Sequence, residues 1–323
     1  MSQMPPRSSS SSRASLPRDI IQFLSNYPSN PSNPSSNTNL KFYQNQIPAK
    51  PSKKTIEELQ TSLKGNFKEL EFNHNFIQWL FPIREQGVNY QAKPLELHEI
   101  TELKKDSKAM ERLIESYRIM LEFYGFKLVS PLTGELTLDL SQDSNSSSSS
   151  IPSYLKRFEN LENNSHNFLR ITRILKCLNE FGFPQHPPAF LLYILTLQSP
   201  SPSNKPEQQR EYLISRGLIK SMDNYWKYCI RDSKDREFVI ETIDRVRNLG
   251  NKNNNKVEEE EFSWNVENYR EWVKSRALER NSDNNSTEEE GEGEGEGEGK
   301  KRKNQDEEEE EEVSQKKKWC SIL

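Results

Sequence analysis

Apolar side chains recur at helical spacing in many segments of this chain. The longest such pattern covers residues 107–124, where it persists for four turns and stops at Gly125, a residue suited to a helix end. Its apolar positions are Met110, Leu113, Ile114, Tyr117, Met120, Leu121 and Tyr124. Shorter patterns of the same period predict further helices at residues 55–63, 95–105, 151–161, 165–181, 188–197, 207–219, 222–231 and 234–248. The pattern therefore predicts a mostly α-helical fold.

Residues 71–82, EFNHNFIQWLFP, place six large apolar or aromatic side chains around a histidine and end at a proline. We call this stretch the signature segment. Its apolar residues fall at i, i+4, i+7 and i+8, which predicts one helix over residues 70–81 with a buried face. The residues on that face are Phe72, Phe76, Trp79 and Leu80. His74 and Gln78 are left as candidates for an outward-facing ligand or partner surface.

Two segments leave alternatives open. Residues 127–140 alternate apolar and polar side chains around Pro131 and Gly134, which fits either a small β-hairpin or a loop. Residues 262–276 have the spacing of an amphipathic helix, which either docks on the domain or stays separate from it.

Composition limits the length of the folded part. Hydrophobic residues make up 32% of the 323 positions and charged residues 29%, and the apolar deficit lies in the two ends and in internal polar tracts. Residues 1–38 are rich in Ser, Pro and Asn and are expected to be mostly disordered, with one weak helical patch at 19–24. Residues 249–323 form an acidic and basic tail with the same expectation. One helical domain over residues 39–248 remains, with a Ser-rich insertion at 142–150.

Several classes of function lack support in the sequence. Three widely spaced cysteines, with no CxxC or His/Cys cluster, predict neither a disulfide framework nor a zinc site. No zinc finger or RNA-recognition motif accompanies the formal net charge of −4, so no nucleic-acid role is expected. The first residues contain no apolar core of a secretory signal, and the apolar run at 189–197 is too short to span a bilayer. We therefore expect a protein that is neither secreted nor transmembrane.

The histidines do not point to catalysis. His166 stands at a helix start beside Ser165, where the helix dipole disfavours an imidazolium, so a neutral structural ring is expected. No carboxylate or thiol is spaced to complete a catalytic or metal site with His74 or His166. No catalytic residue, metal or cofactor is predicted, and an enzyme is the least supported class.

A basic stripe of Arg170, Arg173 and Lys176 steps at i, i+3 and i+6 along one predicted helix. The simpler interpretation is a solvated face that pairs with Glu159 or Glu180. The alternative is a docking face for phosphate, an acidic peptide or a protein partner.

Several segments, taken in order, resemble the shared N-terminal region of the opioid growth factor receptor family. Besides the signature segment, the resemblance rests on residues 39–43 (NLKFY), 87–89 (GVN), 120–128 (MLEFYGFKL), 157–161 (RFENL) and 165–178 (SHNFLRITRILKCL). It covers residues 39–197 and continues more weakly to 240. The Ser-rich insertion departs from the family's usual length, and an acidic tail stands where some members carry repeats.

The resemblance implies a non-enzymatic, receptor-like protein that binds an enkephalin-type peptide, restrains cell proliferation and resides at the nucleus or perinuclear membranes. The ligand would engage a surface near the signature segment. The alternative is a helical adaptor or scaffold that binds a protein partner and has no peptide ligand.

Two short motifs bear on location. Cys320-Ser321-Ile322-Leu323 fits the C-a-a-X prenylation motif, and Leu at the last position favours geranylgeranylation of Cys320. Three preceding lysines would add attraction to an anionic membrane, while the acidic run at 307–312 would oppose it. The basic cluster Lys300, Lys301, Arg302 and Lys303 is either a nuclear localisation signal or an ordinary feature of a charged tail. We expect a cytoplasmic or nuclear protein that is attached peripherally to a membrane through a lipid.

Overall fold

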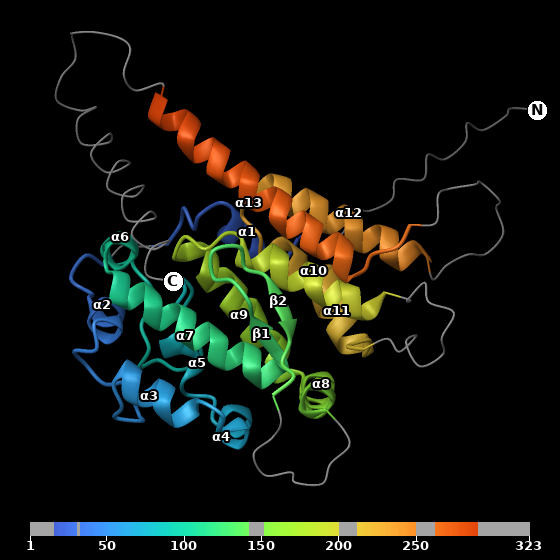
Figure 1. Cartoon of the computed structure of the whole chain (residues 1–323). Coiled ribbons are helices and arrows are strands. Elements are labelled where there is room, and N and C mark those ends of the chain that lie inside the picture. The colour runs from blue at the N-terminus through green and yellow to red at the C-terminus, as the bar shows by residue number, and fades with distance from the viewer. Residues whose placement is uncertain (1–15, 31–32, 142–151, 200–211, 250–261, 290–323) are drawn as a thin grey trace, which may run out of the picture.

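A computed structural model describes residues 16–30, 33–141, 152–199, 212–249 and 262–289 of the chain (Figure 1). Helices dominate this part, as the periodicity predicted. In chain order the helices before the single hairpin are α1 (Arg18–Leu24), α2 (Thr38–Tyr43), α3 (Ile56–Leu63), α4 (Phe67–Phe72), α5 (Ile77–Leu80), α6 (Leu97–Lys105) and α7 (Ser107–Tyr124). Those after it are α8 (Ser153–Asn163), α9 (His166–Glu180), α10 (His186–Gln198), α11 (Arg216–Asn224), the 3-10 helix η2 (Trp226–Tyr228), α12 (Ser233–Leu249) and α13 (Val266–Glu289).

Helix α7 runs through the middle of the molecule and confirms the longest predicted helix (Figure 1). Its first turn is capped by Asp106, whose carboxylate accepts a hydrogen bond from the Ala109 amide at 3.1 Å. Its last turn closes on Gly125, which adopts the left-handed conformation at φ 90°. One face of α7 packs on α3, α6 and α8, and another face meets apolar residues of α9 and α10. The helix therefore supplies the centre of the apolar core.

The region after α7 folds as the hairpin that the alternation allowed. Strand β1 (Phe126–Leu128) pairs antiparallel with β2 (Leu136–Leu138), with Phe126 opposite Leu138 and Leu128 opposite Leu136. Phe126, Leu128 and Leu136 are buried. The hairpin thus covers the end of α7, and the loop alternative does not hold.

The prediction of one continuous helix over residues 70–81 is wrong. Helices α4 and α5 are separate, and Phe72 is 73% exposed and does not lie in the core. The interruption has a local cause: the Asn73 side chain accepts a hydrogen bond from the Asn75 amide at 2.8 Å and so competes with the helical pattern. Phe76, Trp79 and Leu80 are buried as predicted.

Both ends of the described chain pack on the domain. The weak helical patch at 19–24 is observed as α1, and its Ile20 and Phe23 are buried. Packed residues therefore extend N-terminal to residue 39, where the domain was expected to begin. The helix predicted at 262–276 is observed as the longer α13, which lies alongside α10 and α12 (Figure 1). Trp264 donates a hydrogen bond from Nε1 to the Leu192 carbonyl at 3.0 Å, so α13 docks on the domain.

The helices predicted at 207–219 and 222–231 are replaced by α11 and η2 within the described residues. The chain breaks between them at Tyr225 (φ −132°, ψ −58°), which lets Trp226 enter the core. Trp226 Nε1 donates to the Phe168 carbonyl of α9 at 3.2 Å, so a tertiary contact decides this boundary.

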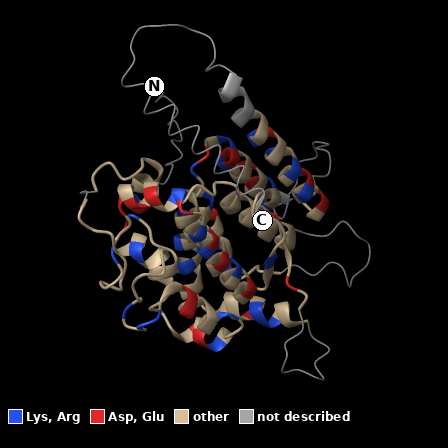
Figure 2. Cartoon of the chain, turned by 60° about the vertical axis from the view of Figure 1, so that its left-hand side comes forward, with Lys and Arg blue, Asp and Glu red and all other residues tan. Residues whose placement is uncertain are grey.

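Acidic and basic residues are interspersed along the helices in Figure 2.

Candidate functional site

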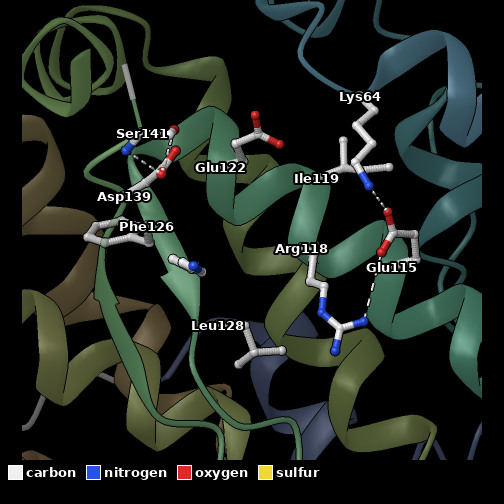
Figure 3. A pocket seen from close by; sticks show the side chains of 10 residues that line it. Lys64, Glu115, Arg118, Ile119, Glu122, Phe126, Leu128, Asp139 and Ser141 are labelled. Carbon is white, nitrogen blue, oxygen red and sulfur yellow. Dashed lines mark hydrogen bonds and ion pairs between the residues drawn. The ribbon is translucent and has the colours of Figure 1, made fainter. Parts of the chain in front are cut away.

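A pocket of about 270 Å³ opens between α7, the hairpin and the end of α3. Figure 3 shows that side chains from these three elements converge on it. The lining residues are Lys64, Glu115, Arg118, Ile119, Glu122, Phe126, Lys127, Leu128, Asp139 and Ser141. We call it the Glu122 pocket. Acidic and basic groups surround an apolar floor of Ile119, Phe126 and Leu128.

At one end of the Glu122 pocket, the charged groups neutralise each other. Lys64 Nζ lies 2.9 Å from Glu115 Oε1, and Arg118 Nη1 lies 3.8 Å from Glu115 Oε2 (Figure 3). The hydrogen bond and charge of Glu115 raise the pKa of the Lys64 ammonium. Glu115 is therefore occupied by two cations from the protein itself.

Asp139 is likewise engaged by protein groups. Its carboxylate pairs with the Arg157 guanidinium, which also donates to the Glu122 carbonyl at 2.8 Å. The Ser141 hydroxyl donates to the same carboxylate at 2.7 Å. Burial alone would raise the pKa of Asp139, but the hydrogen bonds from Arg157 and Ser141 outweigh it and lower the pKa. Asp139 is therefore an ionised structural carboxylate.

Glu122 differs from its two acidic neighbours. Its half-buried carboxylate accepts no hydrogen bond from the residues that the structure describes, and it lies at the rim of the pocket among the lining residues (Figure 3). Burial, followed by the nearby charge of Asp139, raises the pKa of Glu122, while the charges of Arg157 and Lys64 lower it by less. A cationic group in the pocket would offset the charge of Asp139. Of the three carboxylates in this pocket, Glu122 is therefore the one best suited to pair with an ammonium group.

The signature segment forms a second polar cluster, which we call the Arg170 junction. Arg170, from α9, donates from Nη1 to the Leu70 carbonyl at 2.6 Å and from Nη2 to the Asn73 carbonyl at 3.0 Å. Glu71 accepts hydrogen bonds from Asn160 at 2.7 Å and Asn167 at 3.2 Å. These buried bonds join α4 to α8 and α9.

The two predicted histidines meet at the edge of this junction. The rings of His74 and His166 lie 5.0 Å apart, edge to face, and His166 Nε2 lies 2.8 Å from Glu71 Oε1. Burial, followed by the charges of Arg170 and His74, outweighs the attraction of Glu71 and lowers the pKa of His166. The neutral ring expected for His166 agrees with this direction, although the sequence argument rested on the helix dipole. His74 is exposed and its Nδ1 lies 3.1 Å from Arg170 Nη2.

Gln78 does not face outward as expected. Its side chain is buried, and its Oε1 accepts a hydrogen bond from the Asn89 amide at 3.0 Å. Because α4 and α5 are not one helix, Gln78 and His74 do not share a face. Of these two predicted surface residues, only His74 reaches solvent.

The basic stripe is not an exposed face either. Arg170 is 4% exposed and Lys176 is 1% exposed. Arg173 donates from Nε to the Phe81 carbonyl at 2.8 Å, and burial lowers its pKa. Lys176 pairs with Glu85 at 2.7 Å and with Asp19 of α1 at 3.0 Å, and not with Glu159 or Glu180. Helix α9 faces the core on this side because α1 and the segment after α5 cover it.

None of the site residues predicted from the sequence lines the Glu122 pocket, although four of its lining residues fall in the segment 120–128 that carries the family resemblance. One signal was present: Glu115, Arg118 and Glu122 fall at i, i+3 and i+7 on α7, which marks one polar face of an otherwise apolar helix. Lys64 and Asp139 come from distant parts of the chain and had no such signal.

The described residues contain no group of three or more His, Cys, Asp or Glu side chains arranged to hold a metal ion. Among the same residues, no helix combines the length and apolar character needed to cross a bilayer. Cys320 and the cluster at 300–303 lie outside the described residues. Cys177 and Cys229 are buried, and burial raises the pKa of the Cys229 thiol to about 12.

Comparison with known proteins gives consistent matches. The family model described as "Opioid growth factor receptor (OGFr) conserved region" matches residues 32–253. The opioid growth factor receptor-like protein 1 of Xenopus tropicalis is 37% identical over 226 residues, which are 69% of this chain and 40% of that protein. The opioid growth factor receptor of Homo sapiens is 38% identical over 232 residues, which are 69% of this chain and 30% of that protein. The match thus spans less than half the length of these relatives. No solved structure matches the chain.

Proposed function

This chain belongs to the opioid growth factor receptor family, and from that membership we propose that it is a non-enzymatic, receptor-like protein that binds a peptide. The family resemblance suggests an enkephalin-type ligand and a role in restraining cell proliferation. The Glu122 pocket supports a peptide ligand more directly than the signature segment does, because the outward face once expected there is largely buried.

The observation that carries this proposal is the half-buried Glu122 carboxylate in the pocket, which accepts no hydrogen bond from the part of the chain that the structure describes. An α-ammonium group is the cation that every unmodified peptide presents at its first residue. Paired with Glu122, it would lie beside the ring of Phe126 and the apolar side chains of Ile119 and Leu128. The pocket is large enough for one terminal residue and its first peptide bond, and the rest of the ligand would extend over the hairpin.

Calorimetric titration of the full chain with an enkephalin-type peptide tests the proposal. We expect saturable binding that weakens about tenfold or more for the N-acetylated peptide and for Glu122→Gln, because each change removes one charge of the pair. Binding should also weaken as pH falls through the raised pKa of Glu122, since the protonated carboxyl carries no charge. Glu102→Gln, an exposed position on α6 outside the pocket, is the matched control. Absence of saturable binding would remove the peptide-receptor function.

The alternative is an adaptor that binds a protein partner and has no peptide ligand. Two large exposed apolar side chains, Phe72 and Leu169, each adjoin a residue of the Arg170 junction and favour this second candidate. The basic stripe cannot serve as its docking face, because Arg170 and Lys176 are buried. The same titration separates the two functions, since an adaptor of this kind would not bind the free peptide.

Membrane attachment belongs to this proposal as a separate step. Where Leu323 is the last residue of the cellular protein, we propose that Cys320 is geranylgeranylated and that the lysines before it strengthen attachment to an anionic surface. Imaging of the tagged protein with and without Cys320→Ser tests this. An unchanged distribution would rule out the anchor, and the cluster at 300–303 can be tested for nuclear import in the same cells.

A further inference from the structure

Helix α1 and the turn after it bury two aromatic rings in an unusual environment. Phe23 and Tyr27 are almost completely buried but lie outside the continuous apolar core, to which Ile20 of the same helix belongs. The groups that hold them are charged side chains of α9, of the segment before α12 and of the segment after α5. We call the surface formed by Arg84, Glu85, Lys176 and Arg231 the α1 groove. Cations over aromatic faces attract the rings, so these contacts add to the burial of both side chains.

Helix α1 itself presents an acid and a phenyl ring. Asp19 accepts a hydrogen bond from Lys176 Nζ at 3.0 Å. The Phe23 ring lies between two cations, with Lys176 Nζ 5.7 Å and the Arg231 guanidinium carbon 4.4 Å from its centroid. Arg231 also donates from Nε to the Phe23 carbonyl at 3.3 Å. The groove therefore recognises a carboxylate, a ring and a main-chain carbonyl within one helical turn.

The turn after α1 presents a phenol. The Tyr27 hydroxyl donates to Glu85 Oε1 at 2.7 Å, and the Arg84 guanidinium carbon lies 5.5 Å from the centroid of the Tyr27 ring. Arg84 also donates from Nη1 to the Asn26 carbonyl at 2.8 Å. The rings of Phe23 and Tyr27 meet edge to face at 6.2 Å. The Tyr27 hydroxyl and the Asn26 carbonyl thus both have a counterpart in the groove.

The backbone of the segment is held in a costly conformation. Asn26 and Tyr27 adopt left-handed φ values of 57° and 52°. This region is disfavoured for a residue as bulky as tyrosine and persists only where surrounding contacts impose it. Residues 18–27 therefore fit the groove at a cost in their own backbone energy. A peptide that binds without this cost can replace them.

Groove and occupant also differ in their relation to the family. Arg84, Glu85, Lys176 and Arg231 lie within the matched region 32–253, whereas α1 and Tyr27 precede it. Lys176 is almost fully buried beneath α1. Burial lowers its pKa, but Glu85 and Asp19 more than compensate and raise the pKa above the ordinary value. Glu85 of the groove supplies one carboxylate partner at 2.7 Å, and Asp19 of α1 adds a second at 3.0 Å. The groove residues lie within the matched region, and the second carboxylate comes from outside it.

We propose that the α1 groove is a docking site for a peptide segment of a partner protein that forms one short helix and a following turn and bears a carboxylate, a phenyl ring and a phenol at four-residue spacing, and that residues 18–27 of this chain are its built-in competitor. The first two anchors lie on the helix and the phenol lies on the turn. The site is separate from the Glu122 pocket, so the two proposals stand or fall independently.

The test uses full-length protein and a fluorescein-labelled peptide of residues 16–30, LPRDIIQFLSNYPSN. In the double variant Phe23→Ala/Tyr27→Ala, the weakened built-in occupant should free the groove. Fluorescence anisotropy should show at least about tenfold tighter peptide binding to this variant than to the wild type, because a tethered occupant competes at millimolar effective concentration. A peptide carrying Asp19→Lys and Phe23→Ala is the matched control and should not bind. Equal, weak binding to both proteins, or equal binding of both peptides, would overturn the proposal.

A second measurement, on wild-type protein, tests the proposal even where the double variant fails to fold. In wild-type protein, amide hydrogen exchange of residues 18–27 should accelerate when excess unlabelled peptide 16–30 is added, while α9 stays protected. Unchanged exchange at millimolar peptide would overturn the proposal. The proposal would also be overturned if light scattering showed a wild-type dimer whose copies exchange α1. The partner would then be a second copy of this chain.

Discussion

Arg170 satisfies main-chain carbonyls at the end of α4 and the start of the following turn, 97 to 100 residues away in sequence. The last carbonyls of a helix lack partners within it, and a guanidinium offers five donors in a rigid fork. Its guanidinium also faces the Phe76 ring at 5.4 Å. One distant side chain therefore stabilises the break between α4 and α5, which local periodicity alone would not produce.

His186 provides a prediction at the same scale. Its ring is fully buried, with Nε2 2.8 Å from the Pro131 carbonyl, and burial lowers its pKa to about 3. The unfolded chain protonates this histidine near pH 6.5. Between these values the unfolded state binds more protons, so the free energy of unfolding should fall as pH falls, by up to about 1.4 kcal/mol per pH unit.

Urea unfolding of the wild type and of His186→Gln at about pH 7 and pH 5 measures this contribution. The stability difference between the two proteins should shrink by about 2 kcal/mol at the lower pH, because glutamine does not titrate. His98→Gln, at a partly exposed histidine, is the control. Parallel pH curves for wild type and His186→Gln would contradict a buried neutral ring.

Helix ends fix the directions of the elements. Gly125 ends α7 at φ 90°, and the chain reverses there so that β1 returns along the helix and completes the Glu122 pocket. Gly65 has a similar φ of 67° after α3, but open space surrounds the position of a Cβ. The same backbone conformation thus occurs in a crowded and an uncrowded setting.

Alanine substitution at the two glycines separates backbone strain from crowding. Gly65→Ala should cost about 1 kcal/mol of unfolding free energy, the ordinary penalty of a left-handed alanine. Gly125→Ala should cost about 2–4 kcal/mol, because its Cβ would lie 3.0 Å from Phe158 Cε1 and 3.2 Å from the Tyr154 carbonyl oxygen. Chemical denaturation measures both values, and equal costs would show that α8 yields to the new methyl group.

At the scale of the whole molecule, the packed body is larger than the region shared with the family. Helices α1 and α13 lie outside residues 32–253, and both bury aromatic residues against the domain. Tyr269 of α13 accepts a hydrogen bond from the Leu136 amide of β2 at 2.8 Å. The hairpin beside the Glu122 pocket is therefore supported by a helix from beyond the shared region.

Asp235 is the charged anchor of α13. Its fully buried carboxylate pairs with Arg276 Nε at 2.6 Å and with Arg280. Asp235→Ala should cost about 2–4 kcal/mol of stability and accelerate amide exchange in residues 266–280, because Arg276 would be left buried without its main partner. Asp244 is an exposed aspartate on the same helix, and its carboxylate lies 3.5 Å from Lys227 Nζ. Asp244→Ala should change stability by less than about 0.5 kcal/mol. Equal exchange in the two variants would show that apolar contacts alone hold α13.

Residue spacing by itself determined the helical class and the extent of α7, because these follow from local periodicity and helix-end chemistry, and it left the hairpin after Gly125 as one of two alternatives. Ordered aromatic segments in the sequence also identified the family. Only the tertiary structure decided the rest: Asn73 and Arg170 interrupt the signature segment, and α1 covers Lys176. The Glu122 pocket joins Lys64, Glu122 and Asp139 from three elements. Spacing reports which side of a helix is apolar, but it does not report which charged residues another element will cover.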